Sequence, residues 1–294
     1  MDEPARTTFL ALQAAARAAG KDLNAAAGRF AVERLLHRVF ASPHAGRFAV
    51  KGGALMLIAE GLGPLRGRAT SDADIAVPGY DGGLPGFEAM MREALAAPHP
   101  DGVTFDLDTW QVKAEREAGG IGGGSVTVRA RIGRHVVGVK VDVTFDERTA
   151  LSALERVEYP CVLGGSFPVS RVPPAHIAAD KVQAMVRHGA RNHRLRDHYD
   201  LYVLLTRGGA EPAAVAEALP ASLACFGLDL PADADSIPAL AHEEALRRLR
   251  PWEAERRSRG FGVETPPFPE LNAFLRERVG EILALAHAQA PRPF

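Results

Sequence analysis

Residues 66–77, RGRATSDADIAV, carry the feature that decides the fold: two aspartates one residue apart, followed at once by an apolar run. The run predicts a buried strand, and alternation along a strand places Asp72 and Asp74 on the same side of it. Two like charges held this close repel each other unless a cation lies between them. Carboxylate oxygens suit a hard ion such as Mg2+. The segment therefore predicts a metal-binding strand, although a lone Asp-x-Asp pair is also common in solvent-facing turns.

The preceding segment predicts a strand, a tight turn and a helix. A short apolar run at 48–50 is followed by Lys51, Gly52 and Gly53, and then by the apolar stretch ALMLIAEGL. Without side chains, the two glycines would let backbone N–H groups and the helix N-terminus approach a triphosphate. The alternative is an ordinary turn.

Downstream, the stretch from 103 to 146 alternates with a period of two and predicts neighbouring strands separated by glycine-rich turns. Asp142 is an acid inside VKVDVTF, an otherwise apolar, period-two strand. A carboxylate there has to be satisfied, and a metal shared with Asp72 and Asp74 would do so. The alternative is a solvent-facing strand residue, because Lys140 and Thr144 have the same parity.

After Pro173 and Pro174 the pattern becomes helical, first in AHIAADKVQAMVRHG and then in LRDHYDLYVLLTR. Lys181 lies within an apolar helical pattern and could present its ammonium to nucleotide phosphates. The plainer alternative is an ion pair with a surface acid. Asp197 and Asp200 lie one turn apart on one helical face, where they could orient Lys181, Arg194 or the incoming nucleotide. An ordinary ion-paired helix would show the same spacing.

These patterns predict a mixed α/β portion over 1–165 and a helical portion over 166–294. The first portion should begin with two helices within 3–40 and contain a strand at 74–77 and a helix at 84–97. A short strand is possible near 158–162. The last stretch, 211–294, should be mostly helical, with proline-rich breaks at 231 and 266–269.

Composition excludes several classes of protein. The chain has 294 residues, of which 47% are hydrophobic, enough for one large core or two modest ones. Cys161 and Cys225 have neither disulfide-framework nor zinc spacing, which fits a reducing cytoplasm. The chain has no run of about 18 apolar residues, and acids stand at the N-terminus where a signal peptide would be positive. We expect a cytoplasmic protein that does not span a membrane.

The formal net charge of −1 argues against a bulk nucleic-acid coat protein but permits a local basic face. Two segments are basic, 187–207 and 247–259. Either could form such a basic face, and either could equally be a solvated helix surface.

Five motifs together resemble, in order, those of the AbiEii/AbiGii toxin family: KGGALML, RATSDADI, VKVDVTF, DKVQAMV and RLRDHYDLYVLL. The resemblance covers roughly 48–206. The family includes the MenT-like toxins of type IV-like toxin–antitoxin systems. The resemblance implies an α+β fold, with a DNA polymerase β-like nucleotidyltransferase core and a helical C-terminal domain that contributes Lys181 and Asp200 to the cleft.

The resemblance also implies roles for individual residues. Gly52 and Gly53 would form the phosphate-binding turn, and Mg2+ would bind Asp72, Asp74 and Asp142. Further nucleotide contacts would come from Arg68, Thr70, Ser71, Lys181, Arg196 and Asp197. Asp142 would help to deprotonate the attacking hydroxyl, and Asp200 would be the late acid of the motif. Eighteen residues, 54–71, separate Gly53 from Asp72, more than in the minimal polymerase β pattern.

The implied activity is transfer of NMP, with a pyrimidine base, from NTP to an RNA acceptor such as the 3′ end of tRNA. Such a toxin blocks translation, serves in abortive infection and is held in check by a cognate antitoxin. Two alternatives stay open: transfer of NMP to a protein hydroxyl, and a catalytically silent member that only binds a partner. The sequence leaves open the preferred base, the acceptor, the antitoxin, the oligomeric state and the role of 210–294.

Overall fold

Seven strands form one mixed sheet in the N-terminal part of the chain, in the order β3-β4-β5-β2-β1-β7-β6. The strands are β1 (Ala49–Val50), β2 (Asp72–Ala76), β3 (Val103–Ala118), β4 (Ile121–Ile132), β5 (His135–Phe145), β6 (Glu155–Pro160) and β7 (Ser166–Arg171). The computed structural model describes residues 3–67, 72–118, 121–145, 148–189, 195–259, 261 and 263–289. Within these ranges, the side chains of 116–118, 121, 244–246, 258 and 259 are not described.

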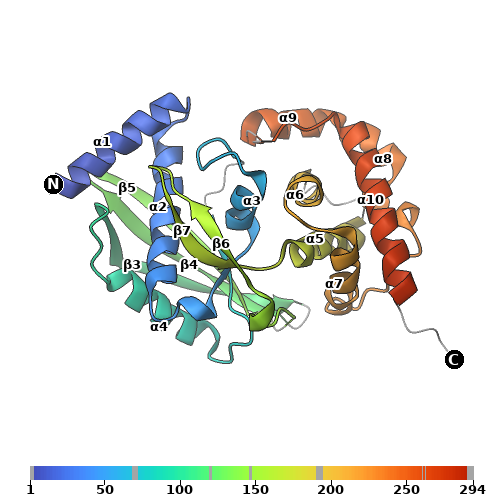
Figure 1. The fold of residues 1–294 in the computed structure, drawn as a ribbon, viewed down its shortest axis with the longest axis horizontal. Coiled ribbons are helices and arrows are strands. Elements are labelled where there is room, and N and C mark those ends of the chain that lie inside the picture. The colour runs from blue at the N-terminus through green and yellow to red at the C-terminus, as the bar shows by residue number, and fades with distance from the viewer. Residues whose placement is uncertain are drawn as a thin grey trace. The chain divides into compact units, whose positions relative to one another are not determined.

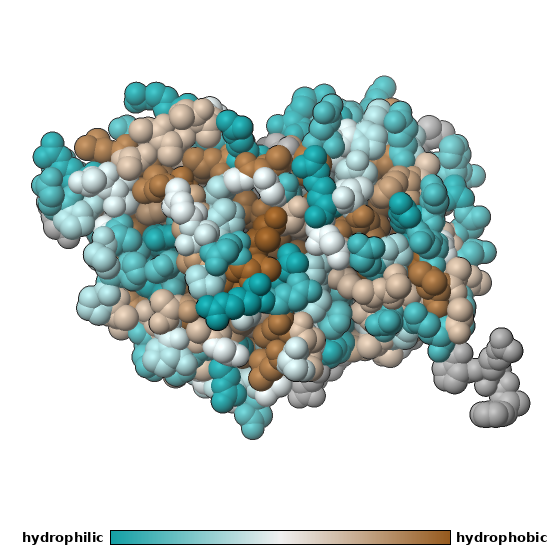
Figure 2. Space-filling view, in the orientation of Figure 1, coloured by the Kyte–Doolittle hydropathy of each residue, from teal (hydrophilic) through white to brown (hydrophobic). Residues whose placement is uncertain are grey.

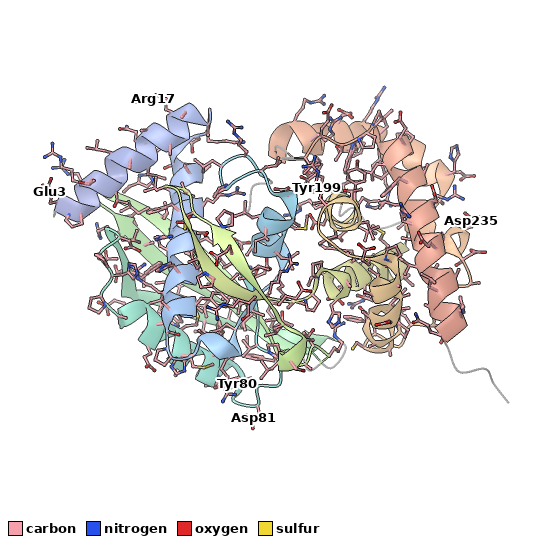
Figure 3. All side chains as sticks on the ribbon, in the orientation of Figure 1. Glu3, Arg17, Tyr80, Asp81, Tyr199 and Asp235 are labelled. Atoms are coloured by element: carbon pink, nitrogen blue, oxygen red, sulfur yellow. The ribbon has the colours of Figure 1, made fainter. Side chains whose placement is uncertain are left out.

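Four helices accompany the sheet: α1 (Glu3–Ala18), α2 (Leu23–Ala41), α3 (Gly52–Glu60) and α4 (Gly83–Ala96). Figure 1 shows α2 crossing the sheet, where it contacts β5 and β2, and α4 contacts β3 and β4. Glu3 and Arg17 mark the two ends of α1 in Figure 3, an acid in the first turn and a base in the last, as the helix dipole favours. Asp22 caps α2 by accepting a hydrogen bond from the N–H of Ala25.

The core of this unit lies between α2 and the sheet. Phe30 and Leu35 of α2 belong to the same buried cluster as Ile75 of β2 and Val141 of β5. Alternation along β2 and β5 places every second residue in this cluster, and the intervening residues lie on the other face.

Most of the predicted elements are confirmed. Two helices occupy 3–18 and 23–41, and β1, α3, β2, α4, β3, β4 and β5 follow where the patterns predicted them. The possible strand near 158–162 is β6, which begins earlier, at Glu155. The strand β7 was not predicted; it pairs with β6 along its whole length and with β1 at Arg171.

The chain divides into two compact units, Met1–Val172 and Pro173–Phe294. The division falls seven residues after the expected boundary at 165, because β7 completes the sheet before the chain turns helical. The helices of the second unit are α5 (Pro174–His188), α6 (Leu195–Thr206), α7 (Pro212–Ala224), α8 (His242–Arg247), α9 (Leu249–Arg259) and α10 (Phe268–Gln289). Short 3-10 turns at Ala234–Ser236 and Pro238–Leu240 join α7 to α8. This unit has its own core, in which α5 packs on α6 and α7, and α10 packs on α6 and α7.

Candidate active site

The parallel pairing of β2 with β5 brings the three predicted acids onto one face of the sheet. Asp74 lies directly opposite Asp142, and Asp72 lies opposite Lys140. Residues paired in this way project to the same side. Their neighbours Ala73, Ile75, Val141 and Val143 project to the other side and are buried in the core. The strand register therefore confirms that the three acids share a face.

The turn between β1 and α3 packs directly against Asp74. The N–H of Lys51 donates to the backbone oxygen of Asp74 at 3.0 Å, and the N–H of Gly53 donates to Oδ2 of its carboxylate at 2.9 Å. The carboxylate thus lies at the N-terminus of α3, where the helix dipole favours negative charge. The Gly53 N–H, which we expected to face a phosphate, donates its hydrogen bond to Asp74 instead.

Two features of the structure require glycine at position 52. Its φ is +49°, a conformation that L side chains rarely adopt. A Cβ atom at this position would also lie 2.8 Å from the Cβ of Asp74, and closer still to its carboxylate. The turn is built around the Asp74 side chain, and only a residue without Cβ allows this approach.

Lys140 forms an ion pair with Asp142 on the same face. Its Nζ lies 2.7 Å from Oδ1 of Asp142 and donates to Oδ2 at 2.8 Å. The hydrogen bond to Asp142 raises the pKa of Lys140 above its usual value; partial burial opposes this, and the charges of Asp142 and Asp72 add to it. Both side chains are about one third exposed, 39% for Lys140 and 29% for Asp142.

Lys51 is a second cation on this face. Its Nζ donates a hydrogen bond to Oγ1 of Thr144, which follows Asp142 by two residues on β5. Lys51 and Lys140 were not predicted as site residues. A signal for Lys140 was present in the sequence, since it precedes Asp142 by two residues on the same strand.

The acids do not converge on one point. Among the described residues, no three acids, histidines or cysteines lie close enough to hold a metal ion together. Asp74 is turned to the N–H of Gly53, and Asp142 is turned to Lys140. Three of the expected nucleotide contacts, Arg68, Thr70 and Ser71, lie outside the described residues, as does Arg194.

The helical unit contains a second charged cluster. Lys181 of α5 donates to Oδ1 of Asp197 and to Oδ2 of Asp200, both on α6 and both at 2.8 Å. The two carboxylates are 2% exposed, and the Lys181 side chain is 17% exposed. Burial alone would lower the pKa of Lys181, but the charges and hydrogen bonds of Asp200 and Asp197 outweigh it and raise that pKa. The two acids therefore hold the Lys181 ammonium in place, and Arg196 lies exposed on α6.

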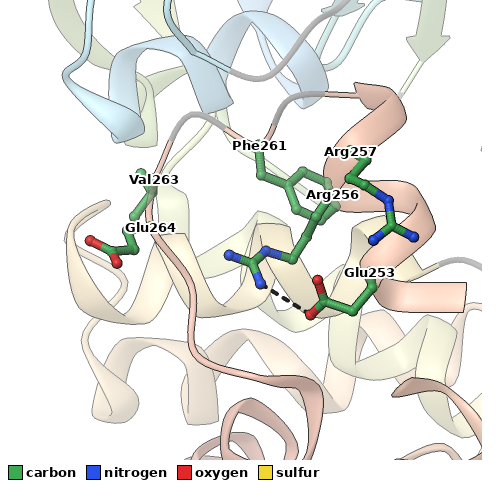
Figure 4. Close-up of a pocket in the computed structure, with 6 residues that line it drawn as sticks. All are labelled: Glu253, Arg256, Arg257, Phe261, Val263 and Glu264. Carbon is green, nitrogen blue, oxygen red and sulfur yellow. Dashed lines mark hydrogen bonds and ion pairs between the residues drawn. The ribbon is translucent and has the colours of Figure 1, made fainter. Parts of the chain in front are cut away.

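A cavity of about 440 Å³ lies in the same unit. It is lined by Glu253, Arg256, Arg257, Phe261, Val263 and Glu264 (Figure 4). Arg256 donates to Glu253 at 3.0 Å, as the dashed line marks. The ring of Phe261 stacks on Tyr199 with 4.1 Å between ring centroids and 11° between planes.

Tyr199 connects the cavity wall to α6. The N–H of Val263 donates to the Tyr199 hydroxyl at 3.0 Å, and Tyr199, labelled in Figure 3, is the residue just before Asp200. Hydrogen bonding and stacking therefore anchor Val263 and Phe261 to Tyr199 of α6, the helix whose acids bind Lys181.

The large hydrophobic residues that are exposed are scattered along the described part of the chain. The exposed large hydrophobic residues are Leu10, Val112, Val136, Leu151, Leu163 and Leu249. They belong to different elements, and Figure 2 shows brown residues interspersed with teal ones on the face it draws. Within the described part of the chain, none of the helices combines the length and apolarity needed to cross a bilayer.

Two Helicobacter pylori proteins of known structure are similar to this chain. JHP933 is 13% identical, with a TM-score of 0.46, over 89% of this chain and 94% of its own. The second, described as a candidate nucleotidyltransferase, is 12% identical, with a TM-score of 0.48, over 89% and 97% of the two chains. No curated protein matches the chain.

The sequence matches the family described as "Nucleotidyl transferase AbiEii toxin, Type IV TA system" over residues 34–277. The match covers most of the chain and includes both charged clusters. The acids on one sheet face, the glycine turn beside them and the helical C-terminal part agree with a polymerase β-type nucleotidyltransferase core. The chain belongs to the AbiEii family of nucleotidyltransferase toxins of type IV toxin–antitoxin systems.

Proposed function

We propose that this nucleotidyltransferase transfers NMP, with a pyrimidine base, from NTP to an RNA acceptor, the 3′ end of tRNA. The observation that carries the site is the register of β2 and β5, which aligns Asp74 with Asp142 beside the Gly52 turn. The pyrimidine and the tRNA end rest on the resemblance of the motifs.

The residues present suit Mg2+. Three carboxylates share one sheet face, and one of them, Asp142, already binds a cation, the ammonium of Lys140. Asp72, Asp74 and Asp142 would hold the ion, for which Asp74 and Asp142 have to turn from their present partners. When bound, Mg2+ neutralises phosphate charge and stabilises in-line displacement at the α-phosphorus.

Proton transfer and contacts with the nucleotide would come from the chain's own residues. Asp142 accepts the proton of the attacking hydroxyl, whose oxygen bonds to the α-phosphorus as the bond to pyrophosphate breaks. The resemblance of the motifs assigns a contact with nucleotide phosphates to Lys181, whose ammonium Asp197 and Asp200 hold. Further contacts to the nucleotide are assigned to Gly52, Gly53, Arg68, Thr70, Ser71 and Arg196.

The cavity beside Phe261 supports an RNA acceptor. Arg256 and Arg257 line it from the basic segment 247–259, next to an aromatic ring. Guanidinium groups bind phosphates, and aromatic rings stack on unpaired bases, a combination common in proteins that bind single-stranded RNA. Glu253 and Glu264 also line the cavity, so its wall carries charges of both signs.

A protein antitoxin is the second partner, because the family acts in toxin–antitoxin pairs. We propose that a cognate antitoxin suppresses transfer in the cell. Co-expression of the adjacent gene should restore growth of cells that express the toxin.

The substrate assignment is tested by incubating the purified protein with Mg2+, total RNA and each α-labelled NTP in turn. We expect label in tRNA from CTP or UTP. Label in RNA from a purine nucleotide would contradict the proposed base alone. Label in protein would support transfer to a protein hydroxyl instead, and the absence of label from both would favour a catalytically silent member.

A further inference from the structure

Lys140 lies beside two of the three acids on the sheet face. It lies opposite Asp72 across the β2–β5 pair, and its side chain runs along β5 to Asp142. The ammonium is therefore in contact with one proposed metal ligand and in the electrostatic field of another.

The ion pair and a metal ion need the same oxygens. An ionised carboxylate is an acceptor only, and both oxygens of Asp142 face the Lys140 ammonium, at 2.7 and 2.8 Å. A divalent ion bound to Asp142 would also repel an ammonium this close. Lys140 has a flexible aliphatic stem and is 39% exposed, so it can withdraw into solvent.

We propose that Lys140 is a displaceable counter-cation of the carboxylate site. It neutralises Asp142 when no divalent ion is bound, and it leaves Asp142 when the ion binds. This inference rests on the proposed metal site. It assigns to Lys140 a positioning role, in which it opposes metal binding and limits the repulsion among the three acids in the metal-free protein.

The test is Mn2+ binding to the full chain without nucleotide, measured from the electron paramagnetic resonance signal of free Mn2+. Lys140→Gln removes the competing charge, and we expect about fivefold tighter binding, the size expected for loss of one partly exposed ion pair. Lys140→Arg keeps a cation and should bind Mn2+ no more tightly than the wild type. Lys113→Gln is the matched control, because Lys113 aligns with Asp142 across β4 but two strands away. It should stay within about twofold of the wild type.

Asp142→Asn distinguishes failure of the Lys140 inference from failure of the proposed metal site. If wild-type binding weakens in Asp142→Asn but Lys140→Gln binds as the wild type does or more weakly, Lys140 is not a counter-cation and the metal site stands. If Mn2+ binding is unaffected by Asp142→Asn, the proposed metal site itself is wrong, and the inference with it. Lys140→Met keeps the aliphatic stem and repeats the test if circular dichroism shows that Lys140→Gln is unfolded.

A second readout follows from the same competition. In EDTA, Lys140→Gln should melt at a lower temperature than the wild type, because Asp142 then lacks its counter-charge. Mn2+ should raise the melting temperature of the variant by more than that of the wild type. Equal shifts in both proteins would count against the inference.

Discussion

The carboxylate of Asp74 accepts a hydrogen bond from the backbone N–H of Gly53, with 2.9 Å between Oδ2 and N. This bond joins the first turn of α3 to the strand that carries the Asp-x-Asp pair, 21 residues further along the chain. The position of a proposed metal ligand therefore depends on the turn before it, as well as on its own strand.

Gly52→Ala should damage both stability and transfer. The new Cβ would meet the Asp74 side chain, and the φ of +49° disfavours an L residue. We expect a loss of about 2 kcal/mol in the free energy of unfolding, from the left-handed backbone and the crowding together. Urea unfolding measures it. Gly28→Ala is the control: Gly28 lies in α2 with open space around its Cβ position, so alanine should stabilise. A Gly52→Ala protein with wild-type stability would refute this packing argument.

Lys181→Met should destabilise the helical unit by about 3–5 kcal/mol, because it leaves two buried carboxylates without their cation. The loss should depend on pH. The folded pKa of Lys181 is raised above the usual 10.5, so its contribution is complete below about pH 10.5 and is lost as pH rises through the folded value. The difference in unfolding free energy between wild type and variant should therefore shrink above pH 10.5. Lys21→Met, at an exposed position, is expected to change neither quantity; a pH-independent difference would contradict the assignment.

Replacing Arg256 and Arg257 together with glutamine should weaken RNA binding and make it less sensitive to salt. Each phosphate that the protein no longer neutralises lowers the slope of log affinity against log salt by about one. Filter binding to tRNA at several salt concentrations gives this slope. Arg276 and Arg278 of α10 provide the control, because the double change to glutamine there removes the same charge from residues paired with Asp235 and Glu281. Identical slopes for both double variants would exclude the cavity as an RNA-binding site.

Arg38→Met should cost about 3 kcal/mol of stability in the N-terminal unit. Arg38 binds both oxygens of Asp101 at 2.9 Å and also donates to the backbone oxygen of Val103 at 2.7 Å. The side chains of Arg38 and Asp101 are 4% and 7% exposed, so the variant leaves a nearly buried carboxylate without this partner. Arg92→Met removes a half-exposed pair with Glu88, 41% and 31% exposed, and should cost only about 1 kcal/mol of stability. Thermal unfolding compares the two variants, and equal losses would be inconsistent with the structure.

The sequence predicted the elements around the site well because their patterns are local. Period-two alternation identified β3, β4 and β5, and the glycines at 52 and 53 marked the turn before α3. The strand β7 was missed because Pro168 interrupts its pattern, and proline is unfavourable inside a sheet. It is tolerated because β1 has two residues and pairs with β7 only at Arg171, so the missing N–H leaves no gap in that ladder.

The contacts of the site could not be predicted in the same way. Spacing indicates the side of a strand on which Asp74 and Asp142 project, but the atoms they contact depend on elements far along the chain. Asp74 binds a turn 21 residues earlier, and Lys51 reaches Thr144 across 93 residues. Alternation placed Lys140 on the face of Asp142, but only the structure shows that the two are paired.

The most direct test of nucleotidyl transfer by the β2–β5 carboxylates compares two labels on the same nucleotide. Purified protein is incubated with Mg2+, tRNA and CTP or UTP labelled either at the α-phosphate or at the γ-phosphate, and Asp142→Asn is assayed in parallel. We predict that tRNA acquires the α-label but not the γ-label, and that Asp142→Asn loses the transfer at least a hundredfold, on the order expected for loss of a catalytic base. Transfer of the γ-label, or an unchanged rate in Asp142→Asn, would contradict the account.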